Sequence, residues 1–240
     1  IKQFKRIFRN KKFIKVIGLF FLLWCSLQLM QTLAIIYVED VLNVPTGIAN
    51  LVPIPFMLSA LIGLQIWSRV SNSIGRIPAL KYGSIFWIFS CSAALIFPAF
   101  SKSQELGFTF LNDGNNQLLF FLLIMIVSFI GIGASIAYLI PWSLLPDAID
   151  EDPEKPAGIY TAWMVLVQKI GIGVSVQVLG ILLFLSGYKA CIIDENTTNI
   201  IQQSSLAQLT IRICIGLIPS ILVVFGLNIM KTWNKKTLVS

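Results

Sequence analysis

Histidine is absent from this 240-residue chain, and charged residues make up only 12% of it. Without histidine the chain lacks the commonest metal ligand and the usual general base at neutral pH. Soluble domains carry about 25% charged residues, so the low charge, beside 56% hydrophobic residues, excludes that class. The 4 cysteines fall mostly inside apolar runs and predict no disulfide framework. The composition predicts a membrane protein with no metal site and no cofactor.

The apolar residues are gathered in six windows of about 20 residues, the length that an α-helix needs to cross a bilayer. We therefore predict an all-α membrane protein, a bundle of six transmembrane helices. Proline is expected to end the fourth helix at Pro141, and the long fifth window to include a turn outside the lipid or to form a tilted helix. The predicted spans are Val16–Tyr37, Thr46–Trp67, Pro78–Phe97, Leu118–Pro141, Ala157–Ser186 and Leu206–Met230.

Basic residues outnumber acidic ones by 18 to 11, and most of them fall on one side of the predicted spans. Because cytoplasmic loops are rich in Lys and Arg, we predict that both termini lie in the cytoplasm, with the bundle in an inner or plasma membrane. The net charge of +7 is concentrated in Ile1–Lys15, where basic residues contact anionic lipid. No nucleic acid partner is expected.

The first stretch of the chain has neither the short apolar core nor the small-residue cleavage site of a secretory signal. We interpret it as a linker inside a longer protein. The predicted organisation is a basic cytoplasmic linker over residues 1–15, the six-helix bundle over residues 16–230 and a cytoplasmic tail over residues 231–240.

Lys169 lies near the middle of the fifth predicted span. A cation at mid-bilayer costs about 2.5–3.5 kcal/mol on insertion scales, so such residues usually face a bundle interior or a water-filled cavity. At helical spacing Lys169 shares a face with Gly158, Gly173, Gln177 and Gly180. The glycines are typical of a helix-packing seam. The lysine suggests instead an anionic ligand, a carboxylate on another helix or a coupling ion.

A second polar face is predicted on the first span, where Trp24, Gln28, Gln31 and Thr32 recur at helical spacing. Hydrogen bonds between helices would explain it. Aromatic and amide groups are also what a sugar or a polar head group requires. We therefore name Lys169, Gln28, Gln31, Trp24 and Tyr160 as candidate substrate-binding residues.

The predicted cytoplasmic side carries two opposite charge groups. Arg69, Gly75 and Arg76 form a short basic loop, in which glycine favours a tight hinge between packed helices. Asp147 and Asp150 lie at the end of the fourth span. They are expected either to cap helix ends in solvent or to pair with the arginines as a cytoplasmic gate.

These two segments carry a resemblance to the major facilitator superfamily: the Arg69–Arg76 loop and the Pro141–Asp150 run, within IPWSLLPDAID. More narrowly, the chain resembles the glycoside-pentoside-hexuronide:cation symporters, the group that contains melibiose permease. The same run, followed by Lys169, Gly173 and Ser175, is also similar to the sodium-dependent lysophosphatidylcholine symporters. The resemblance covers essentially the whole chain, as the carboxy-terminal half of the twelve-helix fold.

The resemblance implies alternating access, with substrate at mid-membrane between two six-helix halves. Lys169 matches the intramembrane lysine on the family's eleventh helix. Arg69, Gly75 and Arg76 match the loop that latches the cytoplasmic side, although the family's acidic partner inside that loop is not evident. The family's carboxylates for the coupling cation, Na⁺ or H⁺, belong to the amino-terminal half and are absent from this sequence.

We therefore predict the carboxy-terminal half of a secondary active transporter for cation-coupled symport of a sugar or glycoside. Its expected partners are the small-molecule substrate, the bilayer and the missing amino-terminal half. The alternatives are a sodium-coupled lysophospholipid symporter of the same fold and a non-transporting membrane remnant or scaffold. An enzyme is not expected, because neither a nucleophile dyad nor a metal motif occurs within the spans.

Overall fold

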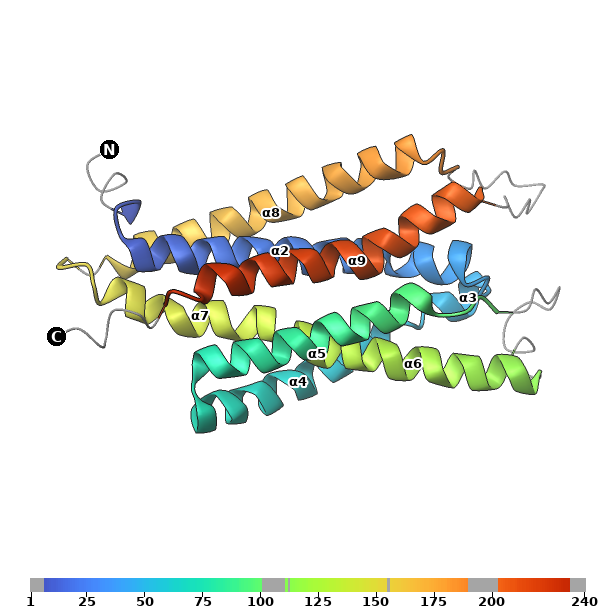
Figure 1. The fold of residues 1–240 in the computed structure, drawn as a ribbon, viewed down its shortest axis with the longest axis horizontal. Coiled ribbons are helices and arrows are strands. Elements are labelled where there is room, and N and C mark those ends of the chain that lie inside the picture. Colours follow the sequence, from blue (N-terminus) through green and yellow to red (C-terminus); the bar gives the residue numbers. More distant parts are fainter. Residues whose placement is uncertain (1–6, 101–110, 112, 155, 190–202, 234–240) are drawn as a thin grey trace.

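The computed structural model describes residues 7–100, 111, 113–154, 156–189 and 203–233, and every regular element among them is a helix (Figure 1). Six helical segments are long and apolar enough to cross a membrane. They confirm the predicted all-α bundle of six spans. The elements are α2 (Lys11–Ile36) continued by the π-helix η1 (Tyr37–Val41), α3 (Thr46–Ala49), α4 (Pro53–Ile74), α5 (Arg76–Ile96), α6 (Gly114–Ala134), α7 (Ile136–Ile149), α8 (Ala157–Leu185) and α9 (Ser205–Met230).

The fourth span differs from the prediction, which wrongly placed its end at Pro141. Both Pro141 and Pro146 lie inside α7, and the helix continues to Ile149. A proline removes one backbone donor and bends the helix without having to end it, because neighbouring helices support the chain. The interruption falls instead at Ser135, which joins α6 to α7.

The fifth span is one continuous helix, so the expected turn outside the lipid is wrong. Its 29 residues make a rod of about 44 Å at 1.5 Å per residue, longer than the roughly 30 Å of a hydrocarbon core. A tilt accommodates such an excess. α8 runs obliquely to α2 in Figure 1, and its tilt in the membrane stays a prediction.

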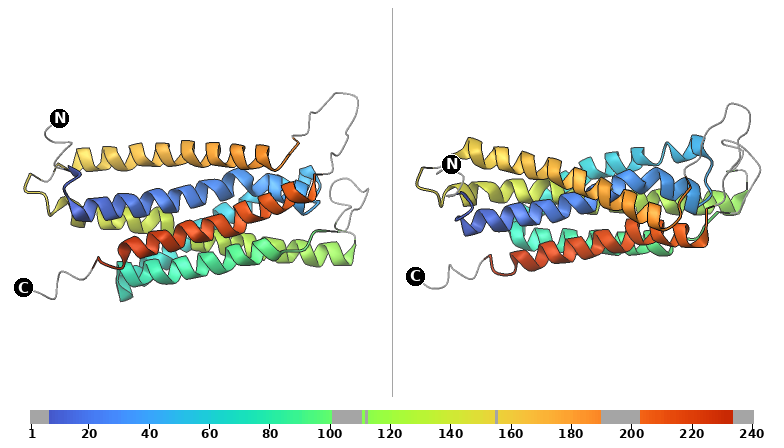
Figure 2. Two further views of the ribbon diagram at one scale, coloured as in Figure 1. Left: turned by 45° about the horizontal axis from the view of Figure 1, so that its top comes forward. Right: turned by 90° about the horizontal axis from the view of Figure 1, so that it is seen from above.

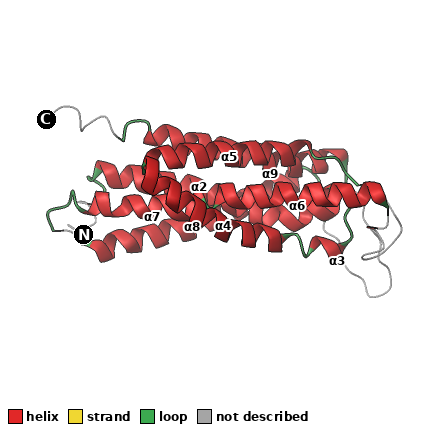
Figure 3. Ribbon diagram, turned by 90° about the horizontal axis from the view of Figure 1, so that it is seen from below, coloured by secondary structure: helices red, strands yellow, loops and turns green. Residues whose placement is uncertain are grey.

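The helix α2 is central to the bundle, where it packs along α9, α8 and α7. Two further packing sets, α4 with α6 and α5 with both α6 and α9, complete the molecule. The helix α8 lies at the edge and touches mainly α2 (Figures 1 and 2). The elements run roughly along one axis, as the view from below also shows (Figure 3).

All of the described segments that the sequence assigned to the cytoplasm lie at one end of this bundle. Here α2 begins, α4 turns into α5, α7 is joined to α8 and α9 ends (Figure 1). We call it the basic end, after Lys12, Arg69, Arg76 and Lys231. The predicted linker is partly helical, since α2 begins at Lys11 rather than Val16. Residues 1–6 of the linker and 234–240 of the tail lie outside the described residues.

Glycines allow α6 to approach its neighbours at backbone distance. A Cβ atom on Gly133 would lie 2.7 Å from the Cα of Trp87, and one on Gly63 would lie 2.8 Å from the Cα of Ile132. At both positions the crowding atoms include backbone, which cannot move aside as the end of a flexible side chain can. The crossings of α6 with α4 and α5 therefore depend on the absence of a side chain.

A Gly133→Val variant should lower the stability of the purified protein, because the added methyl groups would push α6 away from α5. Overpacking of this kind costs about 1–3 kcal/mol. Gly114→Val is the matched control on the same helix, since nothing lies within 4 Å of a Cβ at Gly114, which is exposed at the start of α6. Thermal unfolding in detergent measures both variants, and equal melting temperatures would contradict the close crossing.

Candidate functional site

The polar face of α2 lies against α7 and forms an aromatic and amide cluster. The ring of Trp24 meets the ring of Tyr138 edge-on, with centroids 5.3 Å apart, and the side-chain amide of Gln31 donates to the Tyr138 hydroxyl at 3.2 Å. Gln31 and Thr32 are exposed, while Trp24 and Gln28 are half-buried. We call Trp24, Gln28, Gln31 and Tyr138 the aromatic–amide cluster.

Two groups in this cluster are suited to bind a polar ligand. The indole N–H of Trp24 is buried and has no hydrogen-bond partner among the described residues. The amide of Gln28 bonds only Thr32, one turn away on its own helix, at 3.2 Å. Unpaired donors and short local bonds are easily redirected to a ligand that supplies hydroxyl or head-group oxygens.

The sequence analysis missed Tyr138. Tyr138 lies two residues before the run IPWSLLPDAID. Trp142 follows Tyr138 by one helical turn, and the centroid of the Trp142 ring lies 5.8 Å from that of Phe20. Aromatic residues four positions apart on a helix that faces the predicted polar face were the available signal. Only the packing of α7 against α2 shows that Tyr138 belongs with Gln31.

Lys169 lies on an exposed face of α8, rather than buried inside the six-helix bundle. The packed face of α8 is fixed by Gly171 and Ser175, whose backbone and hydroxyl groups bond Cys25 of α2. Gly171 follows Lys169 by two positions, so the two positions lie about 160° apart around the helix axis. Lys169 therefore points away from α2, and no hydrogen bond or ion pair links it to the described residues.

The glycines that share the Lys169 face also have no neighbour among the residues that the structure describes. No atom lies within 4 Å of a Cβ built on Gly158, Gly173 or Gly180. If this face were a seam between helices of this bundle, a Cβ would meet a neighbour there, as it does at Gly133. The predicted packing seam is therefore not used among the described residues.

Tyr160 does not lie in the aromatic–amide cluster, and its expected place beside the other substrate residues needs correction. Its side chain is fully buried at the basic end, where the ring stacks edge-on against Phe13 at 4.7 Å. Its hydroxyl donates to Asp152 at 3.1 Å and accepts from Asn10 at 3.2 Å. Tyr160 belongs to the first turn of α8. Its hydroxyl links this turn to Asn10 at the start of α2 and to Asp152 just after the end of α7.

The expected pairing of Arg76 with Asp147 is present. The guanidinium Nη2 atom lies 3.0 Å from the Asp147 carboxylate, and Nη1 donates to the backbone carbonyl of Ser143. Gly75 alone joins α4 to α5, with a φ of 94° that favours glycine. This tight link places Arg76 at the start of α5, facing α7.

The other two predicted gate residues take different positions. Arg69 is exposed near the end of α4 and forms no ion pair within the described part of the chain. Asp150 is the residue that ends α7, where its backbone N–H donates to the Pro146 carbonyl. A pair that was not predicted, Lys12 with Glu151 at 2.8 Å, ties the start of α2 to the α7–α8 link.

Comparisons with known proteins agree with this architecture. The chain is 29% identical to an uncharacterized symporter of Synechocystis sp. over 95% of this chain and 39% of that protein. It is 21% identical to a sphingosine-1-phosphate transporter of Xenopus tropicalis, over 95% of this chain and 40% of the relative. It is also 21% identical to a sodium-dependent lysophosphatidylcholine symporter of Danio rerio, over 97% of this chain and 40% of the relative.

The chain thus spans about two fifths of the length of these relatives. A family model described as "MFS/sugar transport protein" matches residues 1–234, nearly the whole sequence. With its six membrane-capable helices, the chain is an integral membrane protein and belongs to the MFS/sugar transport family.

Proposed function

We propose that this chain is the carboxy-terminal half of a cation-coupled symporter that carries a sugar or glycoside by alternating access. The observation that carries the proposal is the exposed face of α8, where Lys169 stands among glycines with open space above them. A cation on a membrane-length helix needs water or a partner. A second helical bundle docked beside this face would enclose the ammonium in a cavity between the two halves.

The length of the relatives supports a second bundle. They are about two and a half times as long as the matched region, which leaves room for another six helices. In this arrangement the coupling cation, Na⁺ or H⁺, binds carboxylates of the amino-terminal half. In this proposal both termini of the chain lie in the cytoplasm, because Lys12, Arg69, Arg76 and Lys231 belong to segments at the basic end of the bundle.

Within the site, the residues have separate roles. Lys169 binds hydroxyl or anionic groups of the substrate, or balances a cation-site carboxylate of the other half. Trp24 and Tyr138 offer ring faces to the apolar side of a sugar, and Gln28 and Gln31 bond its hydroxyls. These contacts hold the substrate at mid-membrane while the gate at the basic end is closed.

A lysophospholipid is the second candidate substrate. The observation in its favour is that relatives of Danio rerio and Xenopus tropicalis are named as lysophosphatidylcholine symporters. The ammonium of Lys169 is as well suited to a phosphate as to hydroxyl groups. The family description names sugar transport, and for that reason sugar or glycoside stands first.

The Lys169→Ala variant of the complete two-half protein should lose roughly 10- to 150-fold of its uptake rate. A hydrogen bond to a charged group contributes about 1.5–3 kcal/mol, and about 1.36 kcal/mol is a factor of ten. Proteoliposome uptake of radiolabelled melibiose-like sugars and of lysophospholipid, with and without a sodium gradient, measures the loss and identifies the better substrate.

Lys231→Ala is the control, because Lys231 is exposed at the end of α9 and has no role in the site. Lys169→Arg keeps the charge and should retain part of the uptake. If Lys169→Ala carried substrate as fast as the unaltered protein, the role assigned to the ammonium would be wrong.

The Arg76–Asp147 pair is proposed as the cytoplasmic gate. The two side chains are 39% and 32% exposed, so the pair contributes at most about 1 kcal/mol to stability. Arg76→Ala should leave the melting temperature nearly unchanged but should favour the cytoplasm-open state by up to about fivefold. A thiol at position 32, introduced as Thr32→Cys, should then react faster with a water-soluble reagent added on the cytoplasmic side.

The charge swap that combines Arg76→Asp with Asp147→Arg should restore slow labelling only in part, because it loses the bond to the Ser143 carbonyl. Lys81→Ala serves as the control, since Lys81 is an exposed cation of α5. Equal labelling rates in Arg76→Ala and Lys81→Ala would show that the pair does not close the cavity.

A further inference from the structure

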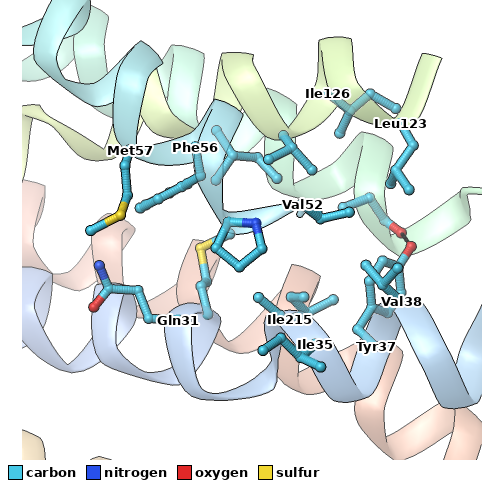
Figure 4. Close-up of a pocket in the computed structure, with 16 residues that line it drawn as sticks. Gln31, Ile35, Tyr37, Val38, Val52, Phe56, Met57, Leu123, Ile126 and Ile215 are labelled. Atoms are coloured by element: carbon cyan, nitrogen blue, oxygen red, sulfur yellow. Dashed lines mark hydrogen bonds between the residues drawn. The ribbon is translucent and has the colours of Figure 1, made fainter. Parts of the chain in front are cut away.

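An apolar cavity of about 300 Å³ lies mainly between α2, α4 and α6 (Figure 4). Its lining includes the last turns of α2, η1 and the first turn of α4, which lie away from the basic end. Its walls are formed by residues such as Ala34, Val52, Phe56, Leu123 and Val127. The cavity adjoins the aromatic–amide cluster but is not part of it, and none of the roles assigned above uses it.

Among the described residues that line the cavity, only Gln31 and Tyr37 have polar side chains, and both have hydrogen-bond partners. The hydroxyl of Tyr37 donates to the backbone carbonyl of Ala94, which leaves the aromatic ring to face the space. The amide of Gln31 donates to Tyr138. A buried water needs two to four polar partners, so this lining favours an apolar occupant over ordered water.

Gln31 connects the two regions. It bonds Tyr138 in the aromatic–amide cluster and also lines the cavity. In Figure 4 Gln31 and Met57 lie at one end of the cavity, and Tyr37 and Leu123 lie at the other. Along α2 and η1, the lining extends from Met30 to Val38, about 12 Å of helix. A ligand with its polar part on the cluster could extend an apolar part past Gln31 into this space.

We propose that the cavity binds the apolar tail of an amphiphilic substrate, a single alkyl or acyl chain attached to a polar head group that rests on the aromatic–amide cluster. This inference rests on the proposed function and narrows its substrate class. At about 30 Å³ for each water-sized group, the cavity accommodates roughly ten methylene groups. Two sources carry this chemistry, an alkyl glycoside and a lysophospholipid, and a free sugar would leave the cavity unfilled.

A chain-length series tests the proposal in the complete protein held in lipid nanodiscs. Direct binding is measured for radiolabelled alkyl glucosides and, in a second arm, for lysophosphatidylcholines, each over chains of about 6 to 14 carbons, with protein-free nanodiscs subtracted. Affinity should rise by up to about fourfold for each methylene group and should level off near ten carbons. Partition into the bilayer alone would rise without such a limit.

Ala34→Phe fills the cavity from α2 and should move the limit to a shorter chain. The decyl compound should lose at least about tenfold in affinity, while the hexyl compound stays within about twofold. Val127→Phe repeats the test from α6, in case one variant fails to fold. Val224→Phe is the matched control, because Val224 is exposed on α9 outside the cavity.

A shift in the limit for glucosides or for lysophosphatidylcholines supports the proposal and identifies the source of the tail. If neither Ala34→Phe nor Val127→Phe, once folded, changes the chain-length dependence, the proposal is wrong. The same holds if free glucose binds as tightly as decyl glucoside. Because binding is measured without transport, a protein that binds the tail but shows no uptake would contradict the proposed function and leave the tail site standing.

Discussion

One ammonium group on a membrane-length helix, that of Lys169, has no hydrogen bond or ion pair with the described residues and needs water or a partner. Lys169 sits on the side of α8 that turns away from α2, among described residues that offer it no counter-charge. In hydrocarbon that position would cost about 2.5–3.5 kcal/mol. Water or a second protein surface removes the cost, and both are supplied if the face lines a cavity between two bundles.

The glycines divide into two groups that support this interpretation. Gly63 and Gly133 are crowded, because α6 crosses α4 and α5 at backbone distance. Gly173 and Gly180 have open space around them, although they lie on a helix of the same bundle. The crowded glycines let α4, α5 and α6 pack closely against one another. The open ones stand on the face that the proposed second half would cover.

The sequence predicted most of the fold, because hydropathy over about 20 residues reports membrane spans directly. For Asp147 it left two alternatives, a helix cap in solvent or an ion pair with an arginine, and the structure has the pair with Arg76. The sequence misplaced two features for a common reason. Periodicity says which face a residue occupies on its own helix, but not which neighbour that face meets or at what depth. Tyr160 was therefore assigned to the site, and Tyr138 was missed.

Pro141 was misread because tertiary support for a proline-containing helix leaves no local signal. The apolar cavity is lined from several helices that are distant in the sequence, and it has no sequence signature.

The most direct test of the central claim is the water accessibility of position 169 in the complete protein. With the 4 native cysteines replaced, Lys169→Cys and Phe89→Cys are compared for reaction with a charged, water-soluble thiol reagent. Phe89 is an exposed apolar residue on α5, away from α8. We expect position 169 to react readily, and more slowly when substrate is bound, while position 89 stays unreactive in lipid. A thiol at position 169 as inert as that at position 89 would place the lysine against hydrocarbon and contradict its role in a transport cavity.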